Sequence, residues 1–151
     1  MKLTEHFSLG ELVASDYAIR HGINNMPVDH EVLSNLNALA LGLERARAVL
    51  LLPMHINSGY RSPKVNAGIG GAQNSAHLRG LAADFVIHGV SPREVCLRLQ
   101  EHADTIGFDK LIHEGTWTHI SFPEAEERPR AQVLTAIFRP GQSTTYMKGI
   151  A

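Results

Sequence analysis

Two side chains in the segment NSAHLRGLAADF have the chemistry to bind a metal ion together. His77 and Asp84 are seven residues apart, and Gly80 between them lets the chain turn sharply, so an imidazole and a carboxylate can converge on one ion. Asp84 stands between the apolar runs LAA and FVI, where a carboxylate is costly unless it is paired or coordinated. The segment therefore predicts either a metal site or a buried ion pair, for which Arg61 and Arg79 are the available partners.

A third possible ligand lies in the segment TWTHISF. Strand alternation there places Trp117, His119 and Ser121 on one face. Two histidines and one carboxylate fill three positions of a tetrahedral zinc site and leave the fourth for water, which is typical of catalytic and not of structural zinc. On spacing alone, ordinary core or surface histidines are the commoner outcome, and the costly position of Asp84 is what favours the metal.

The composition describes one soluble domain over residues 1–151, with 44% hydrophobic and 19% charged residues. A net charge of −1 argues against a nucleic-acid partner, because phosphate contacts need a basic face. Nine histidines make a metal site worth seeking, whereas the single cysteine, Cys96, excludes an intramolecular disulfide and a cysteine-based zinc site. We expect a monomer.

The N-terminal segment MKLTEHFSLGELVASDY contains no apolar stretch long enough for a signal peptide. The run AVLLLP is far too short to cross a bilayer. We therefore expect synthesis in the cytoplasm without a cleaved leader and no membrane partner.

Helices and strands are mixed along the chain without regular alternation, which predicts an α+β class with a mainly antiparallel central sheet and helices packed on it. Ser8 and Glu11 have the spacing of a capping box at the start of a short helix. Apolar periodicity predicts the main core helix over residues 29–50, and Ser91 with Pro92 opens another helix that includes Ala103. Strands are expected over 54–58, 81–88, 109–122 with an interruption at Gly115, and 131–138 with a further piece near 144–150. Loops are expected between Gly59 and Pro63 and over 66–77.

The run SAHLRGLAAD fits the pattern S-x-H-x-x-G-x-A-x-D of the zinc D-alanyl-D-alanine carboxypeptidases and the related phage L-alanoyl-D-glutamate endopeptidases. The segments HFSLGELVAS, INSGYRSPKVNAGIGGAQNS and LIHEGTWTHISF resemble the same group, so the resemblance covers nearly the whole chain. It implies a hedgehog/DD-peptidase-like fold that binds Zn²⁺ through His77, Asp84 and His119. Hedgehog signalling domains share this zinc scaffold, so the fold alone does not establish peptidase activity.

The resemblance also implies two catalytic residues. Arg61, in SGYRSP, matches an arginine that such enzymes direct at the substrate carbonyl or carboxylate, and a guanidinium suits either task. The residues alone favour a loop arginine in solvent or paired with Asp84. The general base is predicted to be Glu114, five residues before His119 as in the small phage-type members, whereas many relatives carry the acid three residues before the histidine, at the position of Thr116.

Glu114 can reach the metal only if the chain turns or bulges next to it. In an uninterrupted strand, an odd separation places Glu114 and His119 on opposite faces, so an irregularity at Gly115 and Thr116 is required. Asp109 is the reserve candidate for the base, although a loop carboxylate is the simpler interpretation.

Four further residues are predicted to contact substrate: Tyr60, Ser75, Trp117 and His113. Trp117 replaces a second, non-ligand histidine of some relatives, and it either shapes the cleft or fills the core. His113 either supports a metal ligand or contacts substrate, or it is an ordinary strand histidine that faces solvent.

The resulting hypothesis is a zinc metallopeptidase that hydrolyses peptidoglycan stem peptides, either as an endolysin-like endopeptidase or as a DD-carboxypeptidase. The expected context is a phage or prophage lysin, made in the cytoplasm and released to the cell wall at lysis. The alternative is a non-catalytic zinc-scaffold protein with a binding or virion-structural role, and a third possibility is an α+β domain without metal.

Overall fold

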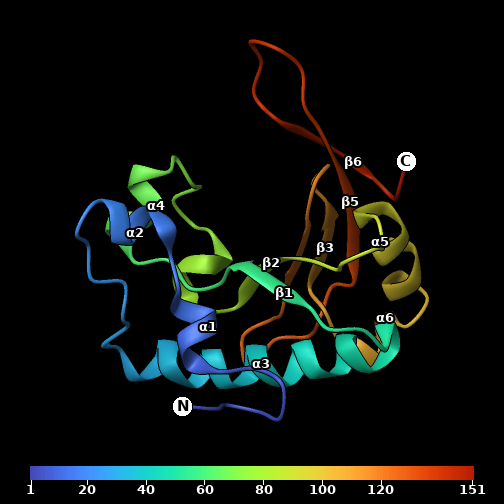
Figure 1. Cartoon of the computed structure of the whole chain (residues 1–151). Coiled ribbons are helices and arrows are strands. Elements are labelled where there is room, and N and C mark those ends of the chain that lie inside the picture. The colour runs from blue at the N-terminus through green and yellow to red at the C-terminus, as the bar shows by residue number, and fades with distance from the viewer.

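In the computed structural model, which describes residues 1–151, the chain forms a six-stranded sheet with its long helices against one face (Figure 1). The helical elements are α1 (Leu9–Val13), α2 (Asp16–Arg20), α3 (His30–Leu50), α4 (Pro63–Gly68), the 3-10 turn η1 (Ala76–Arg79), α5 (Pro92–Gln100) and α6 (Ala103–Ile106). The strands are β1 (His55–Ser58), β2 (Ala82–Val86), β3 (Lys110–His113), β4 (Thr118–Ser121), β5 (Gln132–Ile137) and β6 (Thr145–Lys148).

The strands lie in the order β1-β2-β4-β3-β5-β6. Only β3 and β5 run parallel; every other neighbouring pair is antiparallel, which confirms the predicted α+β class with a mainly antiparallel sheet. β3 and β4 are joined directly by the turn at Gly115, as the sequence predicts. No helix combines the length and the apolar character needed to cross a membrane.

Helix α3 is the main core helix, and it begins directly after its N-cap Asp29, as its periodicity predicts. Leu36, Leu39 and Leu43 are fully buried on its inner face. Gly42 lies on the same helix against the ring of Phe122: a Cβ added to it would be 2.4 Å from the ring. The missing side chain therefore lets α3 approach the segment that follows β4.

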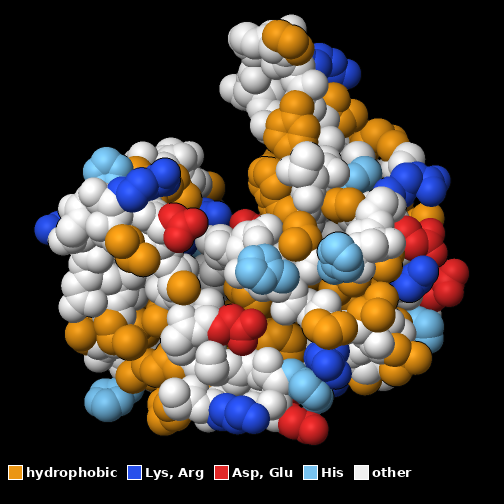
Figure 2. Space-filling view, viewed as in Figure 1, with side chains coloured by type: hydrophobic (Ala, Val, Ile, Leu, Met, Phe, Trp, Pro, Cys, Tyr) orange, Lys and Arg blue, Asp and Glu red, His pale blue; other side chains and the backbone are white.

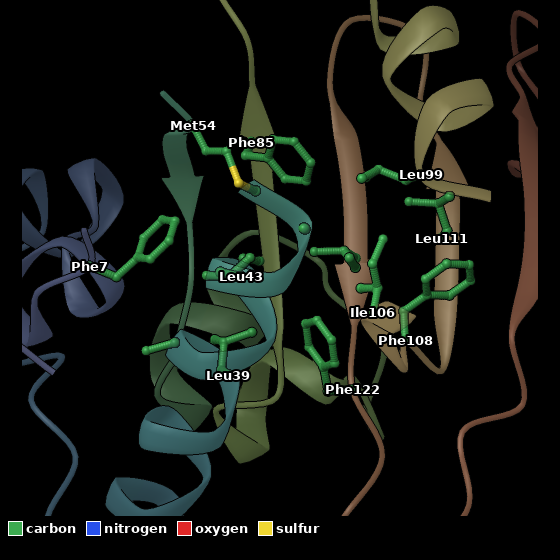
Figure 3. Packing of buried hydrophobic residues seen from close by; sticks show 14 of the residues in the cluster. Phe7, Leu39, Leu43, Met54, Phe85, Leu99, Ile106, Phe108, Leu111 and Phe122 are labelled. Atoms are coloured by element: carbon green, nitrogen blue, oxygen red, sulfur yellow. The ribbon is translucent and has the colours of Figure 1, made fainter. Parts of the chain in front are cut away.

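The core lies between the sheet and α3, α5 and α6 (Figure 3). Phe85, Leu111 and Ile120 come from three neighbouring strands and share the face that the helices cover. Because strand side chains alternate between faces, the residues between them must point to the opposite side of the sheet. That opposite side carries Asp84 and His119, two of the metal-ligand candidates described below.

The sequence signals at helix starts are largely confirmed, with one correction. Ser8 and Glu11 form the predicted capping box, and Ser91 caps α5. The expected loop that ends at Pro63 is instead the start of α4: the Ser62 hydroxyl accepts the Val65 N–H, and Pro63 takes the first helical position. Proline serves both as a loop breaker and as a first-turn residue, so Pro63 alone does not distinguish a loop from a helix start.

Two other boundaries differ from prediction. The segment expected as a loop over 66–77 contains the end of α4 and the start of η1, and Ala103 belongs to the separate helix α6. At the C-terminus, β5, β6 and residues 138–144 between them form an antiparallel hairpin, called here the C-terminal hairpin. Figure 1 shows its tip extending well beyond the body of the molecule.

Candidate metal centre and active-site cleft

His77 is held in a fixed orientation by the backbone around it. The Ser75 hydroxyl accepts the His77 N–H at the start of η1, and the turn ends at Gly80, whose φ of 74° favours glycine. The imidazole Nδ1 lies 2.7 Å from the Gly59 carbonyl oxygen. A proton on Nδ1 donated to that carbonyl leaves Nε2 as the free lone pair, which is how proteins orient metal-binding histidines.

Asp84 and His119 are direct cross-strand partners on β2 and β4. The Asp84 Oδ1 atom lies 2.9 Å from His119 Nδ1 and 3.4 Å from His77 Nε2. One ligand atom from each of the three residues falls within 4.8 Å of the others. Residues 42 positions apart in the sequence thus converge, through the fold-back at Gly80 and the β2–β4 pairing, on a group that could hold a metal ion.

The three donors fit a zinc ion by chemistry and by surroundings. Two imidazole nitrogens and one carboxylate oxygen are a usual ligand set for catalytic zinc. His77 is 3% exposed and Asp84 is 8% exposed, so the carboxylate is largely withdrawn from water. A divalent cation between these groups would offset the cost of burying that charge.

Of the two arginines that could pair with Asp84, the structure places Arg61 beside it and Arg79 elsewhere. Arg61 Nη2 lies 3.4 Å from Asp84 Oδ2, so the ion pair considered from sequence exists, but it uses the oxygen opposite the one that faces the histidines. Arg79 instead lies 3.4 Å from Glu124. Burial alone would raise the pKa of Asp84, but its contacts with the imidazoles of His119 and His77 lower it well below its usual range, so the group stays ionised.

Arg61 is directed into the site by three side chains. Its Nε lies 3.2 Å from the Ser58 hydroxyl and its Nη1 lies 3.5 Å from Asn66 Oδ1, in addition to the contact with Asp84. Burial lowers the pKa of Arg61, while Asp84 and Glu114 act in the opposite direction. An arginine retains its charge under such conditions, so the guanidinium is a fixed cation beside the metal ligands.

Glu114 lies on the same face of the sheet as His119. Ile112 is the cross-strand partner of His119, and Glu114 follows Ile112 by two residues. The chain then reverses: the Glu114 N–H donates to the Trp117 carbonyl, and Gly115 adopts a φ of 86°. The turn that the sequence required at Gly115 is present, and it brings the carboxylate to the metal side. Burial raises the pKa of Glu114, with smaller opposing effects from His119 and Arg61.

Most of the predicted site residues line one cleft of about 800 Å³. Its lining includes the three metal-ligand candidates together with Arg61, Glu114, Ser75 and Trp117. Figure 2 shows the molecule hollowed between the lobe that carries α2 and α4 and the projecting C-terminal hairpin. Trp117 is half-buried at this cleft and does not fill the core.

Two of the predicted substrate-contact residues lie elsewhere. His113 pairs with Thr118, one residue out of phase with Ile112 and His119, so it occupies the opposite face, where its Nδ1 is buried without a hydrogen-bond partner. Tyr60 is 7% exposed and belongs to the hydrophobic core. Neither residue lines the cleft.

Asp109, the reserve candidate for the base, lines the cleft but is already engaged. Arg130 binds both of its carboxylate oxygens, at 3.0 and 2.7 Å. The hydrogen bonds from Arg130 lower the pKa of Asp109, whereas that of Glu114 is raised. Of the two carboxylates, Glu114 is the better proton acceptor near neutral pH.

Sequence reasoning did not identify the contribution of the C-terminal hairpin to the cleft. Leu134 of β5 and Tyr146 of β6 both line it. The available signal was alternation in the strand segments, but which face points to the cleft depends on the parallel pairing of β3 with β5. That pairing joins distant segments and leaves no local pattern.

Comparison with known proteins shows the family to which the chain is similar. The sequence profile of the family described as Peptidase M15 matches residues 5–121. A zinc D-Ala-D-Ala carboxypeptidase of Streptomyces albus G is 36% identical over 63 residues, which is 42% of this chain and 23% of the relative. The chain thus matches less than a quarter of the length of that protein. The C-terminal hairpin lies outside the residues that the family profile matches.

Proposed function

Because the chain belongs to the peptidase M15 family, we propose that it is a zinc-dependent peptidase that hydrolyses peptide bonds in the stem peptides of bacterial peptidoglycan. The observation that carries the proposal is the convergence of His77, Asp84 and His119 in one cleft with Glu114 and Arg61. The name of the Streptomyces relative supports both the metal and the substrate class.

Zinc would be held by His77 Nε2, Asp84 Oδ1 and His119 Nδ1, the atoms that face one another. When bound, it supplies Lewis-acid chemistry, lowering the pKa of water to about 7 and polarising the scissile carbonyl. The Gly59 carbonyl contributes from outside this ligand set by fixing the ring of His77.

Glu114 is the proposed general base. Its carboxylate accepts a proton from the attacking water molecule and passes it to the nitrogen of the leaving amine. A pKa above the ordinary value for glutamate suits both halves of this transfer, because a very acidic carboxyl would hold the proton too weakly. Its position in the cleft on the His119 face supports this role.

Arg61 is the proposed electrostatic partner of the substrate. Its guanidinium stabilises negative charge that develops on the carbonyl oxygen, or binds a carboxylate of the peptide. The contacts with Ser58, Asn66 and Asp84 hold it in place before substrate arrives, so little reorganisation is needed in the transition state.

The cleaved bond is the finer part of the proposal. We favour the L-alanoyl-D-glutamate bond, in an endolysin-like enzyme that reaches the wall when a phage or prophage lyses its host, because Glu114 has the spacing of the small phage-type members. A DD-carboxypeptidase is the alternative, supported by the name of the Streptomyces relative. A purely binding role is disfavoured by the position of Glu114 beside the metal ligands.

Digestion of purified peptidoglycan, followed by mass spectrometry of the products, tests both the peptidase activity and the identity of the cleaved bond. Freed stem peptides with new N-terminal D-glutamate indicate the endopeptidase, and loss of single D-alanines indicates the carboxypeptidase. Zinc-loaded protein that leaves peptidoglycan intact would contradict the peptidase itself. The His77→Ala variant is the control, since it should lose both zinc and hydrolysis.

A further inference from the structure

Tyr146, on the C-terminal hairpin, lines the same cleft as the metal-ligand candidates. It comes from a strand outside residues 5–121, so no part of the family match contributes it. Tyr146 is 52% exposed, which is too much for a residue that fills the core. A large aromatic side chain left half in solvent beside a reactive centre is free to contact a bound molecule.

The sheet register explains how Tyr146 reaches this face. His119 is paired with Ile112, Ile112 with Leu134, and Leu134 with Lys148, so these four residues form one row on the cleft side. Tyr146 precedes Lys148 by two residues and therefore shares its face. The neighbouring residue Met147 is paired with Thr135 and points to the other face.

The phenol of Tyr146 lies where the nearby carboxylates influence its ionisation. Burial raises its pKa, and the carboxylates of Glu114 and Asp84 raise it further. The hydroxyl therefore keeps its proton at neutral pH and is available as a hydrogen-bond donor. A neutral donor beside two carboxylates is suited to a carbonyl oxygen of a peptide, because it adds no charge of its own.

We infer that Tyr146 is a substrate-binding residue whose hydroxyl donates a hydrogen bond to a carbonyl oxygen of the stem peptide in the cleft. This inference rests on the proposed function for the identity of the ligand. The C-terminal hairpin then forms one wall of the substrate site, opposite the segment that carries Arg61 and His77. Figure 2 shows an apolar stretch on the flank of the hairpin that faces the hollow.

The chain provides its own probe for a binding experiment. Trp117 is the single tryptophan, and it lines the cleft, so its fluorescence should change when a ligand enters. The ligand is a synthetic stem pentapeptide, L-alanyl-D-glutamyl at its start and D-alanyl-D-alanine at its end. It is titrated into zinc-loaded Glu114→Gln protein, in which cleavage is suppressed, and the Kd is compared with that of the double variants carrying Tyr146→Phe or Met147→Ala.

Tyr146→Phe keeps the ring and the strand and removes only the hydroxyl, so the thermal midpoint should not change. We expect it to weaken peptide binding by about threefold to tenfold, the effect of one net hydrogen bond, while Met147→Ala leaves the Kd unchanged. An unchanged Kd for Tyr146→Phe, or equal weakening by both variants, would overturn the inference. Because binding is measured without cleavage, failure of the proposed hydrolysis gives a different result: peptide bound, with no products from the unmodified protein.

Discussion

In the proposed mechanism, hydrolysis, as opposed to binding, depends on Glu114. Its carboxylate is the proposed base, and in a continuous strand it would face away from His119. The β3–β4 turn brings Glu114 to the face of His119 although an odd number of residues separates them. The Glu114 N–H donates to the Trp117 carbonyl across the turn, and Glu114 follows Ile112, the partner of His119, by two residues. A residue five positions from a ligand can thus share its face when the chain reverses between them.

Glu114→Gln should lower kcat by about 10²- to 10⁴-fold, the usual contribution of a general base, while zinc content stays the same. The folded-state pKa of Glu114 is raised, so its charged form destabilises the fold at pH values above that pKa. The neutral glutamine should therefore keep or slightly raise the thermal midpoint of the metal-free protein at pH 7. Peptide hydrolysis, metal analysis and thermal denaturation provide the three readouts, and a kcat within tenfold of the unmodified protein would exclude Glu114 as the base.

The ion pair between Asp109 and Arg130 stabilises the fold and takes no part in the proposed chemistry. The pair ties the segment before β5 to the start of β3, and hydrogen bonds from Arg130 lower the pKa of Asp109 in the folded chain. A carboxyl with a lowered folded-state pKa stabilises the fold above its unfolded pKa, about 3.9, and this contribution is lost as the pH falls through the folded-state pKa.

Asp109→Asn should therefore cost stability at pH 7 and cost nothing once the pH lies below the folded-state pKa. Since Arg130 is 62% exposed, we expect no more than about 1 kcal/mol. Urea denaturation of both metal-free proteins at pH 7 and across the acid range measures this difference. If the difference in unfolding free energy between the two proteins does not decrease at acid pH, the ion-pair explanation is contradicted.

At the level of elements, the close approach of α3 to the segment after β4 is set by Gly42. A Cβ at this position would lie 2.4 Å from the ring of Phe122, which is 5% exposed and cannot move freely. Phe122 also lines the cleft, so the helix contact and the substrate site share a residue.

Gly42→Ala should destabilise the protein, because an overpacked core costs about 1–3 kcal/mol and the gain in helix propensity returns only about 1 kcal/mol. Gly10→Ala in α1 is the matched control, since nothing lies within 4 Å of the added Cβ. Chemical denaturation of the two variants should show a lower midpoint for Gly42→Ala and an unchanged or higher one for Gly10→Ala. Equal midpoints would mean that Phe122 moves aside at no cost.

The position of the C-terminal hairpin beside the cleft could not be predicted from local sequence. Its strands could be recognised from their composition, and their antiparallel pairing follows from the short connection. Their orientation toward the cleft depends on β5 joining β3 in parallel. The role inferred for Tyr146 therefore depends on the register of the whole sheet, from β4 to β6.

For the whole molecule, the metal-ligand candidates were predictable because a ten-residue pattern contains two of them and strand alternation orients the third. The same alternation shows why His113 could not join them: adjacent strand residues face opposite sides, so His113 and Glu114 cannot both face the cleft. The core position of Tyr60 could not be predicted, because the chain after β1 is irregular and carries no periodic signal. Its N–H donates to the Leu12 carbonyl, a contact between distant segments.

The central claim, a zinc peptidase built on His77, Asp84 and His119, is tested most directly by removing and restoring the metal. Protein purified without chelators should contain one zinc per chain, and a chelator should abolish peptidoglycan hydrolysis and lower the thermal midpoint, because the metal stabilises only the folded state. One equivalent of zinc should restore both. Protein that contains no zinc as purified and binds none when it is added, or that hydrolyses peptidoglycan equally well after chelation, would contradict the claim.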